Sequence, residues 1–325
     1  MSGRIEQLPI LVLQPHTRCN CRCVMCDIWK VTESREISAE DLERHLEDIR
    51  RLKVRWVVFT GGEPLMHSDL FRLAALLRPD GIRTTILSTG LLLERHAAAI
   101  VESTDEVIVS LDGPEVVHDA IRRVPGAYRR LAEGVRSIHQ LAPAYPIAAR
   151  CTIQSGNAAH LRETVAAARE LGLRSISFLA ADLTSTAFNR PLVWPEDRQS
   201  SVAPPLALLE REVEALIHAY PADGFVLESP AKLRRTVSHF RAHYGLESHV
   251  APRCNAPWVS AVLEANGDVR PCFFHPPIGN TSSASLEEVL NGKLAMSFRG
   301  ALKVVENPIC QKCVCSLWVG PESFE

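Results

Sequence analysis

Cysteine is the residue type in this chain with the clearest capacity for chemistry, and its ten copies are unevenly distributed. Four of them fall within eight residues: Cys19, Cys21, Cys23 and Cys26. Five follow position 250, and only Cys151 stands between the two sets. In a reducing compartment, clustered cysteines more often bind metal or carry electrons than form disulfides. The sequence therefore predicts two separate thiolate sites, one in each half of the chain.

The early set contains the spacing Cys-x3-Cys-x2-Cys, formed by Cys19, Cys23 and Cys26 directly after an apolar, strand-like run. Three thiolates on one short loop suit three irons of a [4Fe–4S] cube and leave its fourth iron open to a small molecule. A structural zinc site would instead be closed by four ligands. Cys21 lies between two of these cysteines, so a closed site with Cys21 as the fourth ligand is the alternative.

The late set combines a Cys-x12-Gly-x4-Cys pattern with a Cys-x2-Cys pair that follows after 37 residues; its members are Cys254, Cys272, Cys310 and Cys313. The turn sequence Asn-Gly-Asp at 266–268 predicts a β-hairpin that brings Cys254 and Cys272 together. Four thiolates would close an auxiliary cluster against substrate, and a zinc ribbon is the alternative. Cys315 competes with Cys313 as the last ligand, and Cys151 is expected to be a buried thiol.

Alternating strand and helix patterns must position the early set. Short apolar runs predict strands at 8–13, 56–59, 84–87, 107–109, 147–153 and 175–179. Helical periodicity predicts intervening helices at 42–52, 70–77, 91–101, 128–141 and 161–171, the first opened by a Ser38–Asp41 capping box. Continuously apolar strands favour a parallel sheet covered by helices, open or barrel-like, with ligand sites at the carboxyl ends of the strands.

The rest of the chain follows other patterns. Four prolines between residues 182 and 205 predict an irregular connection, followed by helices at 206–218 and 232–244. Strand-like pieces at 259–263 and 269–273 and a helix at 286–290 predict a small, metal-dependent second module. We therefore expect a core at 1–182, a linker with helices at 183–250 and a C-terminal module at 251–325.

In combination, the first half resembles the radical S-adenosylmethionine (SAM) enzymes. Residues 19–26, Cys-Asn-Cys-Arg-Cys-Val-Met-Cys, have the family's cysteine spacing after the first strand. The segment Gly-Gly-Glu-Pro at 61–64 ends the second predicted strand, where the family has a Gly-Gly-Glu motif. The resemblance covers about residues 8–180 and implies an α/β fold with a partial (β/α)6 TIM-type barrel.

The resemblance also implies the residues that contact SAM. They are Met25, Gly61, Gly62, Glu63, Ser88, Ser110, Asp112 and Arg150. Glycines let the backbone approach a ligand, and a carboxylate such as that of Glu63 accepts from an amine. Met25 departs from the aromatic residue that is common at its position, but the family uses the backbone there against adenine. Arg150 is the candidate for the SAM carboxylate, and no catalytic acid or base is assigned.

Residues 251–325 resemble the SPASM/twitch extensions of radical SAM enzymes, which bind auxiliary [4Fe–4S] clusters. A full SPASM domain has further well-spaced cysteines, whereas here only Cys315 follows the Cys-x2-Cys pair. The one-cluster twitch form, as in 2-deoxy-scyllo-inosamine dehydrogenase, is therefore the nearer match. The implied cofactors are SAM, a SAM-binding [4Fe–4S] cluster and one auxiliary [4Fe–4S] cluster. The implied metal ligands are Cys19, Cys23, Cys26, Cys254, Cys272, Cys310 and Cys313.

The resemblance implies reductive cleavage of SAM to a 5′-deoxyadenosyl radical that abstracts a substrate hydrogen. An auxiliary cluster that accepts the remaining electron would make the reaction an oxidation, so we expect an oxidoreductase with a flavodoxin- or ferredoxin-type electron donor. The first predicted strand begins at about residue 8, with no cobalamin-binding or peptide-recognition region before it, which favours a small-molecule substrate. The alternatives are a radical SAM peptide maturase that forms a crosslink, thioether or epimer, and a non-enzymatic iron–sulfur or zinc protein.

Composition narrows the classes of partner. The 325 residues are 46% hydrophobic and 23% charged, with a formal net charge of −2, which argues against nucleic-acid binding and polybasic membrane binding. No run approaches the roughly 18 consecutive apolar residues of a transmembrane helix, and the first residues lack a signal-peptide pattern. We therefore expect a cytoplasmic protein without nucleic-acid or membrane partners.

Overall fold

The computed structural model describes residues 3–220 and 224–320. Its first half contains six strands, β1 (Ile10–His16), β2 (Trp56–Gly61), β3 (Arg83–Ser88), β4 (Glu106–Ser110), β5 (Ile147–Ile153) and β6 (Ile176–Ala180). Each strand pairs in parallel with the next along the chain. All six strands predicted from the apolar runs are confirmed, with ends that differ by a few residues.

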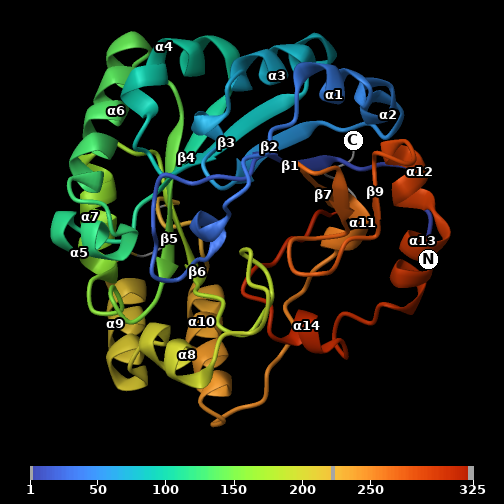
Figure 1. Cartoon of the computed structure of the whole chain (residues 1–325). Helices are drawn as coiled ribbons and strands as arrows, with labels where there is room; N and C mark the ends of the chain where they lie inside the picture. The colour runs from blue at the N-terminus through green and yellow to red at the C-terminus, as the bar shows by residue number, and fades with distance from the viewer. Residues whose placement is uncertain (1–2, 221–223, 321–325) are drawn as a thin grey trace.

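Helices connect these strands and lie along the outer side of the curved sheet (Figure 1). They are α1 (Ala39–Glu43), α2 (Leu46–Arg51), α3 (Leu70–Leu77), α4 (Leu93–Ser103), α5 (Glu115–Arg122), α6 (Ala127–Leu141) and α7 (Leu161–Glu170). The spatial order β6-β5-β4-β3-β2-β1 has no reversal, so successive right-handed crossovers leave every helix on one side. A doubly wound sheet needs such a reversal. The sheet is therefore a partial barrel.

Two helices differ from the sequence prediction. The capping box is present, since the Ser38 hydroxyl accepts from the Asp41 amide and the Asp41 carboxylate accepts from the Ser38 amide. The helix it starts ends at Glu43, and α2 begins at Leu46, so one predicted helix is two. Helix α5 was not predicted; two of its three buried residues, His118 and Arg122, are polar, and the third is Ile121.

The C-terminal strands extend the same sheet. Strand β7 (Ser260–Glu264) pairs in parallel with β1, and β8 (Asp268–Arg270) and β9 (Gly279–Asn280) follow in antiparallel order. The predicted hairpin is confirmed, and Gly267 adopts the left-handed conformation of its turn at φ +85°. The sequence predicted a separate module, but in the structure this hairpin is continuous with the barrel sheet, which has nine strands among the described residues.

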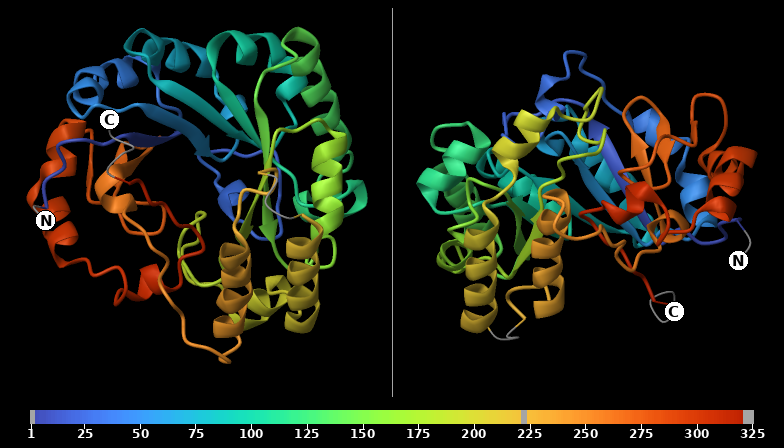
Figure 2. Two further views of the ribbon diagram at one scale, coloured as in Figure 1. Left: turned by 180° about the vertical axis from the view of Figure 1, so that it is seen from behind. Right: turned by 90° about the horizontal axis from the view of Figure 1, so that it is seen from below.

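The remaining helices lie at the two ends of the curved sheet (Figure 2). They are α8 (Glu196–Val202), α9 (Leu206–Ala219), α10 (Pro230–His243), α11 (Ala256–Val259), α12 (Leu286–Asn291), α13 (Lys293–Ala301) and α14 (Pro308–Gln311). Helices α8, α9 and α10 lie near β6, and α12 and α13 lie beside α2. Helix α10 packs against α9 and lies beside β6. Helix α8 lies within the segment predicted to be irregular. Across the described residues, no helix combines the length and apolar character needed to span a membrane.

Candidate functional site

The early cysteines lie in the loop that leaves the carboxyl end of β1. Cys21 and Cys23 are buried, while Cys19 and Cys26 are partly exposed. Helix α5 holds this loop from the side, because the amides of Arg22 and Val24 donate to the carbonyls of Arg122 and Ile121 at 3.1 Å each. Carbonyls in the last turn of a helix have no partner within the helix, so the loop satisfies them and is fixed in return.

Cys19, Cys23 and Cys26 lie close enough together to influence one another's ionisation. Burial raises the pKa of Cys19 and of Cys26 to about 12, and the nearby Cys23 thiol adds to both increases. Cys21 donates a hydrogen bond to Cys23, which lowers the pKa of Cys23 with the help of the Arg122 guanidinium. Three neighbouring thiols with little exposure to water need nearby positive charge to become thiolates together, and iron supplies that charge. The donor set therefore fits an iron–sulfur cluster.

Within the described residues, no three His, Cys, Asp or Glu side chains are placed to hold a single metal ion. A [4Fe–4S] cube takes one thiolate per iron, so its ligands need not converge on one point. Cys21 stays beside Cys23 with its thiol turned to that sulfur, and burial together with this hydrogen bond raises the pKa of Cys21.

The Gly-Gly-Glu segment lies against the cysteine loop at the end of β2. A methyl group added to Gly62 would lie 2.0 Å from the Arg18 carbonyl oxygen, so only glycine fits there. The Glu63 carboxylate is completely buried and accepts from the Ser88 hydroxyl at 2.9 Å, the Thr89 amide at 2.6 Å and the Leu65 amide at 3.1 Å. Ser88 therefore positions Glu63, and burial raises the pKa of that carboxyl group despite these donors.

Asp112 forms a buried ion pair at the end of β4. Its Oδ2 lies 2.6 Å from Nη2 of Arg122, and its Oδ1 accepts from the Thr152 amide at 3.1 Å. Nη1 of Arg122 donates to the Cys23 sulfur at 3.5 Å. The sequence implied a direct SAM contact for Asp112, whereas this geometry connects Asp112 to Cys23 through Arg122.

The other implied SAM contacts occupy different positions around the barrel. Ser110 and Arg150 are paired neighbours on β4 and β5, and Nε of Arg150 donates to the Ser177 hydroxyl at 3.3 Å. The Met25 sulfur accepts from the Gln154 side-chain amide at 3.4 Å, and the Met25 backbone carbonyl accepts from Arg190 at 3.1 Å. Of the eight implied SAM contacts, only Gly61 and Gly62 line the large cavity described below.

The late cysteines come from three segments: the stretch before α11, the end of the β7–β8 hairpin and the region around α14. Cys254, Cys272, Cys313 and Cys315 lie near one another, and Cys310 lies near Cys254 and Cys272. Burial raises the pKa of Cys272 and of Cys310 to about 11. Five thiols therefore gather where a cube needs four, and their chemistry fits an auxiliary cluster.

Cys313 and Cys315, the two candidates for the last cluster ligand, have different surroundings. The Cys313 sulfur donates to the Cys315 carbonyl at 2.9 Å. The Cys315 thiol lies closer to the barrel interior, since Arg150 and Asp182 are among its electrostatic neighbours. His275 is buried, and one of its ring nitrogens lies 3.4 Å from the Cys310 sulfur. This placement makes His275 a hydrogen-bond partner of the late set.

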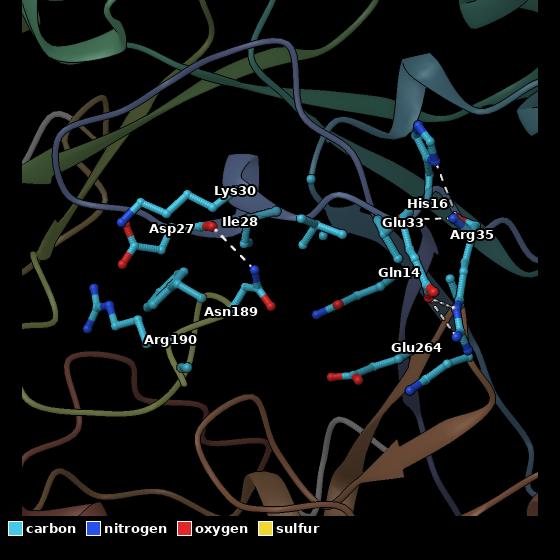
Figure 3. A pocket seen from close by; sticks show the side chains of 18 of the residues that line it. Gln14, His16, Asp27, Ile28, Lys30, Glu33, Arg35, Asn189, Arg190 and Glu264 are labelled. Carbon is cyan, nitrogen blue, oxygen red and sulfur yellow. Dashed lines mark hydrogen bonds and ion pairs between the residues drawn. The ribbon is translucent and has the colours of Figure 1, made fainter. Parts of the chain in front are cut away.

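A cavity of about 810 Å³ is lined by residues of β1, of the early cysteine loop, of the 186–191 segment and of the C-terminal hairpin (Figure 3). Asp27 and Ile28, which follow Cys26, line it together with Phe273, which follows Cys272. In Figure 3, Gln14 and Glu264 enter from one side, whereas Lys30, Asp27, Asn189 and Arg190 stand on the other. The volume is within the range of small-molecule sites. Its lining carries charges of both signs.

Sequence analysis missed Arg122. For Asp182, Arg190 and Trp194, which end or follow the last predicted strand of the core, the sequence leaves two interpretations open, residues that line the pocket or a solvated linker. In the structure Asp182, Arg190 and Trp194 are all buried. Arg122 follows His118 and Ile121 at helical spacing, which places it on the same face of α5. That spacing was the available signal, and it was obscured because two of the three residues are polar.

Two family models match the chain. The model of the radical SAM superfamily matches residues 13–168, and the SPASM model, an iron–sulfur cluster-binding domain, matches residues 254–314. These two domains bind SAM with a [4Fe–4S] cluster and an auxiliary cluster, respectively.

Curated relatives include enzymes of tetrapyrrole chemistry. The chain is 26% identical to the Fe-coproporphyrin III synthase of Methanosarcina barkeri over 231 residues, which are 69% of this chain and 56% of that protein. It is 34% identical to the pre-heme d1 synthase of Dinoroseobacter shibae over 161 residues, 48% of this chain and 39% of that protein. The chain thus spans between about two fifths and three fifths of the length of these relatives.

Solved structures share the fold at low identity. SuiB of Streptococcus suis bound to S-adenosylmethionine superposes with a TM-score of 0.69 at 16% identity, over 97% of this chain and 74% of that one. The BtrN complex with AdoMet and 2-DOIA superposes with a TM-score of 0.51 at 15% identity, over 95% and 94% of the two chains. The cysteine loop on β1, the parallel partial barrel and the two matched models lead to one conclusion: the chain belongs to the radical SAM superfamily and carries a C-terminal SPASM iron–sulfur cluster-binding domain.

Proposed function

We propose that this protein is a radical SAM oxidoreductase that removes a hydrogen atom from a small molecule and transfers the remaining electron to its auxiliary cluster. The observation that carries the proposal is the cavity, whose lining includes residues next in sequence to a cysteine of each set. Asp27 and Ile28 follow Cys26, and Phe273 follows Cys272, which supports a substrate position near both cofactors. When bound, SAM supplies the chemistry of hydrogen abstraction, and the protein orients it and excludes water.

The residues divide this work between two regions. We assign Cys19, Cys23 and Cys26 to the SAM-binding cluster, and Cys254, Cys272, Cys310 and Cys313 to the auxiliary cluster, with Cys315 as the competing ligand. Gly61 and Gly62 allow the backbone to approach the SAM amino group at the cavity wall. Glu63 retains lone pairs for that amino group beyond the three donors that hold it.

The volume of the cavity supports a small molecule. Side chains from β1, the 27–35 loop, the 186–191 loop and the C-terminal hairpin surround it, and its charges are mostly paired within the lining. For example, Nζ of Lys30 lies 2.9 Å from Oδ1 of Asp27, and Nη2 of Arg35 lies 2.7 Å from Oε2 of Glu33. A small polar substrate that replaces some of these partners fits this lining.

The test begins with anaerobic reconstitution, iron counting and a SAM-cleavage assay with dithionite. The proposal expects about eight irons per chain, the content of two cubes, and 5′-deoxyadenosine formation. A protein that releases no 5′-deoxyadenosine although it holds its iron would contradict enzymatic function and support the non-enzymatic alternative.

Oxidation is then tested against the other outcomes. With a deuterated substrate, the proposal expects deuterium in 5′-deoxyadenosine and one SAM consumed per turnover. Return of deuterium to the substrate, with SAM used catalytically, would contradict oxidation.

A radical SAM peptide maturase is the second candidate. It is favoured by the SuiB structure with the precursor peptide SuiA, which superposes with a TM-score of 0.67 at 16% identity, a level that shows the fold alone. Extracts with and without protease digestion, each assayed for stimulation of 5′-deoxyadenosine formation, separate the two. Stimulation that survives digestion supports a small molecule, and stimulation lost on digestion supports a peptide.

A further inference from the structure

The segment that follows β6 contacts the loop of the early cysteines through four side chains. The Arg190 guanidinium donates to the Met25 carbonyl at 3.1 Å, and the Asn189 amide donates to the Asp27 carbonyl at 3.5 Å. The Trp194 indole donates to the Asp27 carboxylate at 2.7 Å, and Arg198 donates to the Val24 carbonyl. In all four contacts the segment supplies the hydrogen-bond donor and the cysteine loop supplies the acceptor. Two of the donors, Arg190 and Arg198, also bring a positive charge close to the loop around Cys26.

Arg190 is the most deeply buried of the four. Its side chain is 0% exposed and that of its partner Asp182 is 2% exposed, with Nη1 and Oδ2 2.5 Å apart. Nη2 also donates to the Asp182 carbonyl at 2.9 Å. The guanidinium stacks on Trp194 with its centre 3.7 Å from the ring centroid, and Arg198 lies 4.8 Å from the centroid of the same ring. This packing fixes the position of a buried positive charge.

The backbone of this segment is also held in an unfavourable conformation. Phe188 and Asn189 both have left-handed φ angles, 60° and 61°, which non-glycine residues rarely adopt in succession. Phe188 packs on Phe273, with ring centroids 4.9 Å apart, and Phe273 follows Cys272. The segment therefore touches the neighbours of both cysteine sets.

The ion pair between Arg190 and Asp182 is oriented with respect to the two cysteine sets. Arg190 lies near enough to Cys26 for the two groups to interact electrostatically. Asp182 lies near enough to Cys315 for the same kind of interaction. The positive end thus faces the early set and the negative end faces the late set.

Nε of Arg190 is buried without a hydrogen-bond partner among the described residues. A buried N–H donor of a charged group is seldom left unsatisfied in a folded protein. Cys26 is an electrostatic neighbour of Arg190, so a cluster held by Cys26 would bring acceptor sulfurs near this donor. The orphaned donor is an observation independent of the orientation of the ion pair.

We propose that Arg190 is a positioning residue that raises the reduction potential of the SAM-binding cluster. This inference rests on the proposed function, because it assumes a cluster at Cys26. The oxidised cluster takes one electron from an external reductant and becomes more negative by one charge, and a fixed guanidinium in a buried site stabilises that reduced form. Hydrogen bonding and nearby charge are among the factors that set the potential of iron–sulfur clusters.

The test is an EPR-monitored redox titration of the reconstituted full chain, with dithionite as the reductant. The signal that changes when SAM is added identifies the three-cysteine cluster, so its midpoint is followed apart from that of the auxiliary cluster. In Arg190→Gln we expect a lower midpoint and at least a tenfold smaller ratio of reduced to oxidised cluster at a fixed potential, which corresponds to about 59 mV for one electron. Arg190→Lys keeps the charge and should recover most of the wild-type midpoint.

Two further variants make the test decisive. Arg44→Gln removes an exposed charge that is paired with Asp41 away from the site, and its midpoint should equal that of the wild type. The double variant Asp182→Asn/Arg190→Gln removes both members of the buried ion pair, so no unpaired charge is left buried. It replaces Arg190→Gln in the titration if that single variant does not retain its cluster. Its midpoint should also fall, because Arg190 is the member of the pair that faces Cys26.

Two results would overturn the inference. One is an unchanged midpoint in both Arg190→Gln and the double variant at full iron content. The other is an equal fall in Arg190→Lys and Arg190→Gln, which would show that shape matters and charge does not. If no signal responds to SAM in the wild type, the proposed function fails, a result distinct from either of these.

Discussion

The two cysteine sets are built in opposite ways. The early set comes from one loop of eight residues, and buried groups of the barrel hold it: Arg122, Glu63 and Arg190 contact the loop or the strand end beside it. The late set is gathered from segments separated by up to 61 positions, from Cys254 to Cys315, and all five of its cysteines are partly exposed. The comparison teaches that the fold preorganises the first site, whereas the second depends more on the metal that binds it.

The largest effect is expected from removing one ligand of each set. Cys23→Ala should reduce SAM cleavage to the level of iron-free protein, because the open iron is lost with the cluster. Cys310→Ala should retain much of that activity, since the early loop stays intact. The measurement is 5′-deoxyadenosine formation under anaerobic conditions with dithionite. An equal loss of 5′-deoxyadenosine formation in both variants would show that SAM cleavage does not depend on the early cluster alone.

Metal removal should separate the two regions by their local stability. After chelation of iron, hydrogen exchange should increase strongly at residues 254–258, 271–277 and 307–317 and little at residues 10–26, because the sheet and α5 still hold the early loop. Mass spectrometry of peptides from the two segments gives the comparison. Similar deprotection in both would show that the early site is not preorganised.

A methyl group at Gly62 should damage the early site by a smaller but measurable amount. The added carbon would lie 2.0 Å from the Arg18 carbonyl, so the cysteine loop must shift, and we expect a loss of about 1–3 kcal/mol in the free energy of unfolding. Iron content should fall as well.

Gly300→Ala is the matched control for that substitution. Gly300 lies in α13 with no neighbouring atom within 4 Å of the added carbon. The Gly300→Ala substitution should leave the free energy of unfolding unchanged or raise it by up to about 1 kcal/mol. A Gly62→Ala protein as stable as this control would show that the loop adapts.

The smallest effect concerns the pH response of the buried groups behind the early set. Burial, together with Arg122, lowers the pKa of His118 from 6.5 to about 3, while its Nδ1 accepts from the Asp112 amide. The unfolded chain therefore binds a proton that the folded chain does not, and stability is lost as the pH falls from 6.5 toward 3.

At pH 5 this difference amounts to about 2 kcal/mol relative to pH 7. His118→Gln keeps an acceptor and cannot titrate, so its free energy of unfolding should change less between these pH values by that amount. Urea unfolding of iron-free protein provides the measurement. Identical pH dependence in the two proteins would exclude His118 as the source.

Much of the fold could be predicted from local patterns. The six apolar runs specified the parallel strands, and Asn-Gly-Asp at 266–268 specified the hairpin. The pairing of β7 with β1 could not be predicted, because it joins residues about 250 positions apart and no local pattern encodes it. Strand register of this kind depends on packing between distant segments.

The candidate site was predictable to a similar extent. Its cysteines and Gly61–Gly62 could be found because spacing and turn chemistry are local. Arg122 could not, and Arg190 could be named only as a possible pocket residue, because each forms a buried ion pair, with Asp112 or Asp182, that only the tertiary structure reveals. A buried arginine resembles a surface arginine in sequence until its partner is known.

The central claim is that one iron of the early cluster is open to SAM while the late cluster is closed. EPR of the dithionite-reduced, fully reconstituted chain, recorded with and without SAM, tests it most directly. The account predicts two signals, of which one changes on addition of SAM and is absent in Cys23→Ala. Two signals that both ignore SAM, or a SAM response that persists in Cys23→Ala, would contradict it.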